Sequence, residues 1–123
     1  MGLLDRLFGA KVAPSSVRDL DGFEAEVLGS AVPVIVDVWS GSCGPCRKLE
    51  PILVEVATRY AGRVKVVEIA AEDAEPELLS MLEVRATPTI VLYERGEEVG
   101  RATGYRPVEW FDQMIAAELD VVR

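Results

Sequence analysis

The chain has 123 residues, half of them hydrophobic and 28% charged, which fits one soluble globular domain with a substantial core. Its 21 acidic and 13 basic residues give a net charge of −8, so we expect neither nucleic acid nor an anionic membrane surface as a partner. There is no histidine, and two cysteines cannot complete a tetrahedral zinc site, so we also expect no bound metal. No apolar run approaches the roughly 18 residues needed to span a bilayer, and the start lacks a secretory cleavage pattern, which predicts a cytoplasmic location.

Residues 1–14 are predicted to be an extension in front of a domain that spans 15–123. In this extension, four hydrophobic residues fall on one helical face: Leu3, Leu4, Leu7 and Phe8. The sequence Pro14-Ser15-Ser16 then interrupts the pattern. Two interpretations remain open: an arm that frays or lies on the domain, and a short amphipathic helix that docks a partner or another subunit.

From about residue 16 the pattern alternates between helix-like and strand-like segments, and a strand before the first helix is left open. In chain order we predict a helix at 19–29, a buried strand at 32–39, a helix at about 44–60, a strand at 63–70 and a short helix at 74–84. A hairpin follows, with strands at 89–94 and 97–103 around Arg95-Gly96, and the last helix runs from Pro107 to about Asp120. Alternating units imply parallel strands with helices on both faces, and the hairpin adds an antiparallel pair. The predicted class is therefore α/β.

Both cysteines lie in the stretch WSGSCGPCRKLEP, between the buried strand and the long helix. Cys43 falls near the cap of that helix and Cys46 one turn further in, so the two side chains share a face and can form a disulfide. Free amides and the dipole at a helix N-terminus favour an anion, here the thiolate of Cys43. Cys46 points back toward the sheet and is better shielded. We predict that Cys43 attacks a substrate disulfide and that Cys46 resolves the mixed disulfide.

Gly44 and Pro45 fit this geometry, because glycine allows a tight entry and proline is tolerated in a first helical turn. A Cys-x-x-Cys pair can also be half of a metal site or two idle thiols. Here it follows a buried strand, opens a helix and has no second ligand pair, which favours redox chemistry.

Asp37 interrupts the apolar strand VIVDVW, where a covered carboxylate is costly unless it has a task or a partner. It lies two residues before Trp39, on the same face of the strand and just upstream of the cysteines. A buried carboxyl has a raised pKa, so Asp37 could take and return the proton of Cys46. The alternative is an aspartate that reaches solvent or caps the following loop.

The stretch RATPTIVLY places a proline directly before a strand. A cis bond between Thr87 and Pro88 would leave nearby backbone groups free to pair with an extended substrate. Spacing alone indicates this weakly, because most bonds that precede proline are trans.

With these residues in place, the chain resembles the thioredoxin family from about Val17 to Leu119. The most specific stretches are VDVWSGSCGPCRKLEPIL, with its Cys-Gly-Pro-Cys sequence, and VRATPTIVLYERGEEVGRATG, with its Thr-Pro pair and Gly104. The resemblance implies the thioredoxin fold, a central mixed sheet flanked by helices on both faces. It implies a thiol–disulfide oxidoreductase that reduces protein disulfides by dithiol exchange through Cys43 and Cys46.

The resemblance also assigns residue roles. Cys43 would be the attacking thiol, Cys46 the resolving thiol and Asp37 the buried acid–base group. The substrate-binding residues would be Trp39, Ser42, Gly44, Pro45, Thr87, Pro88 and Gly104. Among these, Pro88 would be the cis proline and the backbone of Thr87 would pair with substrate. No bound cofactor is implied beyond the Cys43–Cys46 disulfide. Electrons would come from NADPH through a thioredoxin reductase, and the partners of this monomer would be that reductase and disulfide-containing client proteins.

Two positions depart from the family pattern. The family usually has tryptophan immediately before the first cysteine, where this chain has Ser42, so a large apolar contact surface is lost there. The family often has lysine on the third strand near the buried aspartate, and alignment puts Glu68 there. Two nearby carboxyls resist double ionisation, so Glu68 is a candidate modulator that raises the apparent pKa governing resolution by Cys46. The alternative is that Glu68 turns to solvent or pairs with an arginine.

Two other functions are weighed against reduction. A disulfide oxidase or isomerase needs export and often has histidine between its cysteines, whereas here Gly44 and Pro45 occupy those positions. A thioredoxin-fold interaction or chaperone-like module, with secondary redox activity, is favoured by Ser42 and by the apolar N-terminal arm.

Overall fold

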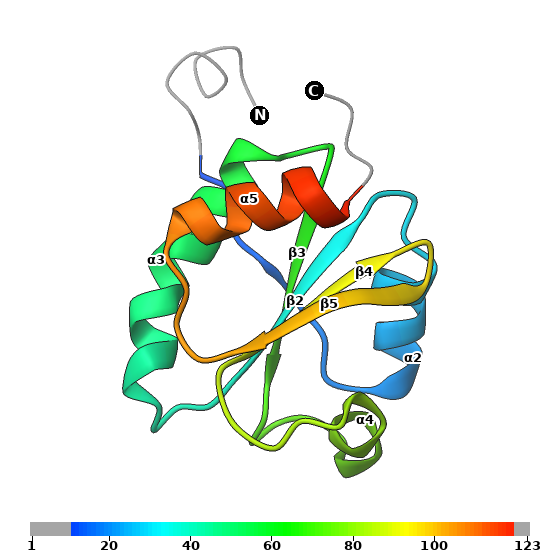
Figure 1. Ribbon diagram of the computed structural model, residues 1–123. Coiled ribbons are helices and arrows are strands. Elements are labelled where there is room, and N and C mark those ends of the chain that lie inside the picture. Colours follow the sequence, from blue (N-terminus) through cyan, green and yellow to red (C-terminus); the bar gives the residue numbers. More distant parts are fainter. Residues whose placement is uncertain (1–10, 120–123) are drawn as a thin grey trace.

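The computed structural model describes residues 11–119, which form a central sheet covered by helices on both faces (Figure 1). Its strands are β1 (Ser15–Ser16), β2 (Val34–Trp39), β3 (Lys65–Ala70), β4 (Thr89–Glu94) and β5 (Glu97–Thr103). Its helices are α2 (Leu20–Phe23), the π-helix η1 (Glu24–Leu28), α3 (Gly44–Arg59), α4 (Pro76–Leu82) and α5 (Val108–Glu118). The predicted α/β class and the predicted order of elements are confirmed.

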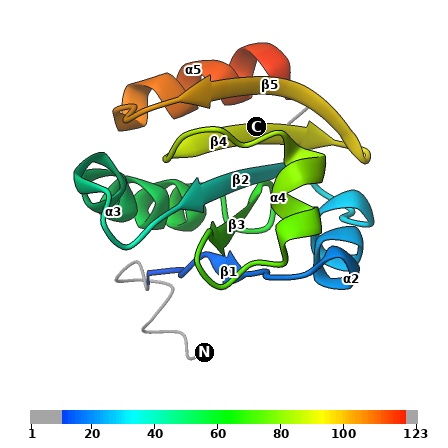
Figure 2. The ribbon, with the colours of Figure 1, turned by 90° about the horizontal axis from the view of Figure 1, so that it is seen from below.

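The sheet is mixed, as predicted from the alternating pattern. Its strands lie in the order β1-β3-β2-β4-β5, which Figure 2 shows from one edge to the other. β1, β3 and β2 are parallel, and β4 is antiparallel to both of its neighbours, β2 and β5. The β4–β5 turn is at Arg95 and Gly96, whose φ angles of 52° and 79° are those that a two-residue hairpin favours.

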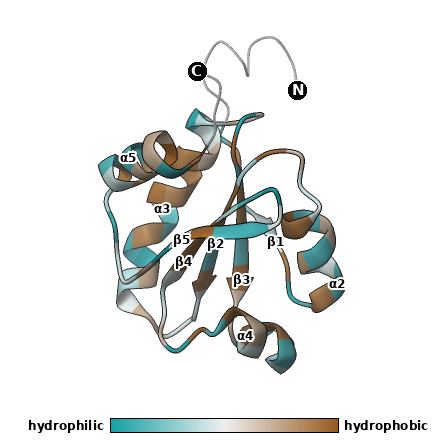
Figure 3. Cartoon of the chain, turned by 45° about the vertical axis from the view of Figure 1, so that its right-hand side comes forward, coloured by the Kyte–Doolittle hydropathy of each residue, from teal (hydrophilic) through white to brown (hydrophobic). Residues whose placement is uncertain are grey.

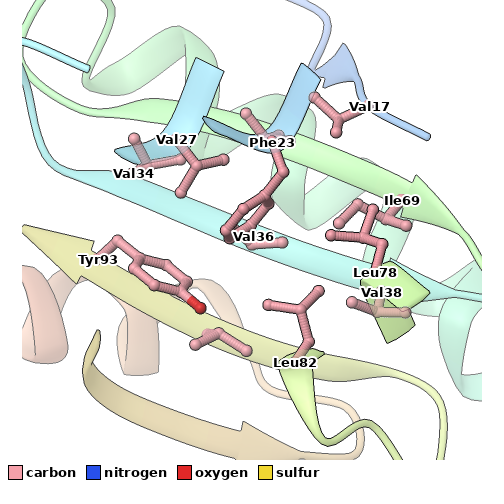
Figure 4. Close-up of a cluster of buried hydrophobic side chains, with 12 residues drawn as sticks. Val17, Phe23, Val27, Val34, Val36, Val38, Ile69, Leu78, Leu82 and Tyr93 are labelled. Atoms are coloured by element: carbon pink, nitrogen blue, oxygen red, sulfur yellow. The ribbon is translucent and has the colours of Figure 1, made fainter. Parts of the chain in front are cut away.

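Alternation along β2 sends side chains into two separate cores. Val34, Val36 and Val38 face one way and pack with Phe23, Val27, Leu78 and Leu82, which come from α2, η1 and α4 (Figure 4). Ile35 faces the other way and packs with α3 and α5 through Leu49, Leu53, Val56, Phe111 and Ile115. The central strands are correspondingly hydrophobic and the helices carry hydrophilic positions as well (Figure 3). Because Asp37 is two residues after Ile35 on the same strand, its side chain points to the same face of the sheet, the face that α3 covers.

The helix predicted over 19–29 is present, but it is not one regular α-helix. It begins at Asp19, whose carboxylate accepts the N–H of Gly22 at 2.7 Å, and changes to a π-helix after Phe23. The Gly29 N–H donates to the carbonyl of Glu24 five residues back, which widens the last turn. Leu28, the last residue of the π-helix, is 37% exposed.

Residues 11–14 have no regular secondary structure and lie on the domain. The Val12 N–H donates to Thr58 Oγ1 of α3 at 2.8 Å, and the Val12 side chain packs on the core beneath α3 and α5. The predicted amphipathic helix falls on residues 1–10, outside the described residues, and stays a prediction. In the described part of the chain, no helix combines the length and apolar character that a membrane crossing requires.

Candidate active site

The two cysteines form a disulfide at the start of α3. Cys43 is the N-cap residue of the helix, and its Sγ accepts the N–H of Cys46 at 3.2 Å. Their Cα atoms are 5.2 Å apart. Cys43 is half-buried, whereas Cys46 is 5% exposed. A helix N-terminus and an amide aimed at Cys43 Sγ both stabilise negative charge on this sulfur, the more accessible of the two.

Asp37 lies behind the disulfide, on the face of β2 that α3 covers. Its side chain is 4% exposed, so the interpretation in which it reaches the protein surface is wrong. Its Oδ1 has no hydrogen-bond partner within residues 11–119. A cavity of about 520 Å³ is lined by both Asp37 and Cys46, as well as by Trp39 and Glu68.

The pKa of Asp37 is raised to about 7, first by burial and second by the negative charge of Glu68. A carboxyl with this pKa is partly ionised at neutral pH, so it can both accept and donate a proton there. The Asp37 carboxyl and Cys46 line the same cavity.

Glu68 is the register partner of Asp37 across the parallel β2–β3 ladder. Its side chain is half-buried, lines the cavity and accepts the hydroxyl proton of Ser16 through Oε1 at 2.8 Å. Its hydrogen-bond partner in the described part of the chain is therefore a serine rather than an arginine. The prediction of a second carboxyl beside Asp37 is confirmed, while its effect on the thiol reaction stays a prediction.

The Thr87–Pro88 peptide bond is cis, the geometry that the family resemblance implies. The carbonyl oxygen of Thr87 lies 3.5 Å from Cys43 Sγ, so the segment before β4 borders the disulfide. The Gly104 N–H donates to the carbonyl of Pro88 at 2.8 Å, which places Gly104 beside the cis bond. Ser40 and Thr87 are also joined, through their hydroxyls, at 3.1 Å.

The remaining predicted binding residues surround the disulfide to different degrees. Ser42, Gly44 and Pro45 are exposed next to Cys43. Trp39 is half-buried at the end of β2, and its indole Nε1 is buried with no hydrogen-bond partner among the described residues. The structure thus brings together the site residues predicted from the sequence, and their roles in binding remain predictions.

Sequence reasoning missed the residues that hold the loop between β2 and α3. The Gly41 N–H donates to Glu72 Oε1 at 2.6 Å, and the Gly41 carbonyl accepts Arg47 at 3.3 Å. One signal was available: Glu72 follows β3 just as this loop follows β2, and the carboxyl ends of neighbouring parallel strands meet at one edge. The pKa of Glu72 is lowered, because the Gly41 N–H stabilises its charged form.

Comparison with known proteins agrees with the arrangement of this site. A family model described as Thioredoxin matches residues 15–117. Thioredoxin 1 of Nostoc sp. is 37% identical over 97 residues, which cover 79% of this chain and 90% of that protein. The thioredoxin of Rickettsia bellii is 37% identical over 105 residues, covering 82% of this chain and 98% of that protein. The thioredoxin of Synechocystis sp. is 38% identical over 85 residues, which cover 69% of this chain and 78% of that protein.

Proposed function

Because this chain belongs to the thioredoxin family, we propose that its reduction of protein disulfides proceeds through Cys43 as the attacking thiol and Cys46 as the resolving thiol. The family makes the protein a thiol–disulfide oxidoreductase of the protein-disulfide reductase type. The observation that carries the division of roles is the unequal exposure of two sulfurs at one helix start. Cys43 is half-buried at the cap of α3, and Cys46 is 5% exposed.

The exchange takes place in two steps. In the reduced protein the Cys43 thiolate attacks one sulfur of a client disulfide, and the other client sulfur leaves as a thiolate. Cys46 then gives its proton to the Asp37 carboxylate and attacks Cys43 Sγ, which closes the Cys43–Cys46 disulfide and releases the second client thiolate. Two electrons have passed to the client, whose thiolates take up protons, and Asp37 later returns its own proton. The disulfide in the structure corresponds to the end of this sequence.

The proton role proposed for Asp37 can be tested with Asp37→Asn. We expect resolution by Cys46 to slow by about a hundredfold or more at pH 7, because proton transfer by a positioned group typically contributes a factor of at least this size. Single-turnover kinetics with a fluorescent disulfide peptide separate the attack of Cys43 from release of the second client thiol. Only the second step should change. The exposed Asp73 provides a matched control through Asp73→Asn.

Two cysteine variants test the assignment of the thiols. Cys46→Ser should accumulate a mixed disulfide between Cys43 and the client, detectable by intact-mass spectrometry, because attack can occur but resolution cannot. Cys43→Ser should give neither the adduct nor turnover. An adduct on Cys46 in the second variant, at the rate of the unmodified protein, would contradict the proposed order.

We further propose that the client binds as an extended segment across the disulfide. The support is positional: the Thr87 carbonyl borders Cys43 Sγ, and Gly104 is hydrogen-bonded to Pro88. The exposed Ser42, Gly44 and Pro45 would contact the client on the other side of Cys43. The half-buried Trp39 would support this surface from below.

A thioredoxin reductase is the proposed source of electrons, with NADPH as the initial donor and the cytoplasm as the compartment. Family membership supports this electron-transport role in cell redox homeostasis. We expect the protein to act as a monomer. Insulin reduction driven by NADPH and an added thioredoxin reductase tests the proposal. If the chemically reduced protein reduces insulin but the NADPH-driven reaction does not turn over, the proposed electron source is contradicted and the thiol chemistry is not.

A further inference from the structure

Ser16, Glu68 and Asp37 lie side by side on three neighbouring strands. Ser16 of β1 is in register with Glu68 of β3, and Glu68 is in register with Asp37 of β2. Because register partners point to the same face of a sheet, all three side chains lie on the face that α3 covers. The edge strand β1 thus reaches the carboxyl behind the disulfide through one intermediate residue.

The contact between Ser16 and Glu68 is a direct hydrogen bond. Ser16 Oγ donates to Glu68 Oε1 at 2.8 Å, and the next backbone amide, Val17 N–H, donates to the Glu68 carbonyl at 3.0 Å. A hydroxyl that donates to a carboxylate oxygen fixes the orientation of the carboxylate. The sequence itself gives no sign of this contact, because 52 residues separate its partners.

The groups that face Asp37 can be named for each element that packs around it. From β3 comes Glu68, and from β4 the register partner is the uncharged Ile90. The segment before β1 closes the cavity with two uncharged residues, Ala13 and Pro14. The chargeable groups that α3 contributes to the cavity are Cys46, Arg47 and Glu50. Glu68 is therefore the negative group paired in register with Asp37, and its position depends on the edge strand.

We propose that Ser16 is a positioning residue for the proton step of thiol exchange: it holds the charged Glu68 beside Asp37 and so sets, from β1, the pH at which Asp37 exchanges a proton with Cys46. This role rests on the proposed function of Asp37. The hydrogen bond keeps a negative charge next to the Asp37 carboxyl, which favours its protonated form. Without the Ser16 hydroxyl, Glu68 is free to turn toward solvent, and Asp37 gives up its proton at a lower pH.

The first experiment measures the Asp37 carboxyl directly, by ¹³C NMR titration of the oxidised protein, in which the cysteines do not titrate. Glu68→Gln should move the titration midpoint down by about one pH unit, the size expected for removing one nearby like charge. Ser16→Ala should move it in the same direction by less. The double variant should match Glu68→Gln alone, because Ser16 acts through Glu68.

Two controls separate positioning from a general effect on the edge strand. Ser16→Thr keeps the hydroxyl and should retain the midpoint of the unmodified protein. Ser15→Ala removes a hydroxyl from the neighbouring residue, which is in register with Val67 and faces the opposite side of the sheet, so it should also leave the midpoint unchanged. An unchanged midpoint in Ser16→Ala, or a shift that adds to that of Glu68→Gln, would overturn the role of Ser16.

The second experiment measures the pH profile of resolution by Cys46 in the same variants. We expect its midpoint to fall in step with the Asp37 titration. If the carboxyl titration moves but the rate profile does not, the proton role of Asp37 in the proposed function is wrong, and with it the effect of Ser16 on the reaction. If the titration itself does not move, the Ser16–Glu68 coupling alone is contradicted.

Discussion

Asp37 is held in an environment that disfavours its charged form. The carboxyl is 4% exposed, one oxygen has no hydrogen-bond partner among residues 11–119, and the neighbouring strand β3 presents Glu68. Burial and the Glu68 charge raise its pKa from 3.8 to about 7. A carboxyl in this environment lowers the free energy of unfolding at neutral pH. The proposed function gives a reason for this cost, because the same raised pKa serves proton transfer to and from Cys46.

Asp37→Asn should therefore stabilise the folded protein at neutral and alkaline pH. The raised pKa means that the folded protein binds this proton more tightly than the unfolded chain, so stability is lost as pH rises from about 4 to about 7. A shift of about 3 pH units corresponds to roughly 4 kcal/mol. Urea unfolding of the oxidised variant and the oxidised unmodified protein measures the difference in their free energies of unfolding. Between pH 4 and pH 8 this difference should grow, in favour of the variant, from near zero to at most this value.

The control for this prediction is a carboxyl that is exposed. Asp73→Asn should show no such growth, because solvent screens a charge at that position. A free-energy difference between Asp37→Asn and the unmodified protein that is the same at pH 4 and pH 8 would contradict the buried, proton-binding carboxyl.

At this scale the sequence predicted the residues whose chemistry is visible in local patterns. Cys43 and Cys46 were found from their spacing at a strand–helix junction, and Asp37 from its place in an apolar strand. Ser16 and Glu72 were missed, because each acts through a hydrogen bond to a distant part of the chain, 52 and 31 residues away. Ordinary serines and glutamates carry no mark of such a bond until the strands are placed side by side.

The connection between β2 and α3 is held in place by three side chains outside the loop. Glu72, after β3, accepts the Gly41 N–H; Arg47, in α3, donates to the Gly41 carbonyl; and Thr87, before β4, bonds the Ser40 hydroxyl. The short loop that carries Cys43 is thereby fixed at its middle. The position of the attacking sulfur depends on these contacts as well as on the helix cap.

Glu72→Ala should release this loop and expose the Gly41 amide to exchange with water. The lowered pKa of Glu72 means that the bond to Gly41 is present above the ordinary glutamate value of 4.5 and is lost as pH falls through the lower folded value. In the unmodified protein the Gly41 amide shift should titrate below pH 4.5, and in the variant this transition should disappear. Hydrogen exchange and ¹⁵N NMR measure both effects. With Asp73→Ala as the control, an unchanged Gly41 amide in Glu72→Ala would show that the hydrogen bond is absent in solution.

Elements were predicted best where one pattern dominated. β4 and β5 have the predicted bounds, because the two strand segments are separated at Arg95-Gly96 by a turn that local sequence specifies. Helix η1 was predicted as part of an ordinary α-helix. A helical apolar pattern does not distinguish an α-turn, with hydrogen bonds four residues apart, from a π-turn such as the one closed by the Gly29 N–H and the Glu24 carbonyl, five residues apart. The two-residue strand β1 was left open, because its pairing depends on β3 rather than on its own residues.

In the molecule as a whole, the fold positions the two cysteines together at the start of α3. Two cores on opposite faces of the sheet fix β2 and α3, and the disulfide lies where these elements meet. An unfolded chain has to close the four-residue ring from Cys43 to Cys46 at an entropic cost, whereas the folded chain fixes both residues in the first turn of α3, where their Cα atoms are 5.2 Å apart in the disulfide form. Folding should therefore favour the disulfide over the dithiol, which makes the reduced protein a better electron donor.

The oxidised protein should accordingly be more stable than the reduced protein by about 2 kcal/mol, the loop-closure value for a ring of this size. By the thermodynamic cycle that links folding and oxidation, the same energy lowers the reduction potential of the folded pair below that of the unfolded chain by roughly 40 mV. Urea unfolding of both forms at pH 7, with excess reductant in one series, measures the first quantity, and equilibration with glutathione before and after unfolding measures the second. The variant with Cys43→Ser and Cys46→Ser should show no dependence on reductant. A reduced form at least as stable as the oxidised form would mean that the fold favours the dithiol, which is the property of an oxidant and contradicts a reductase.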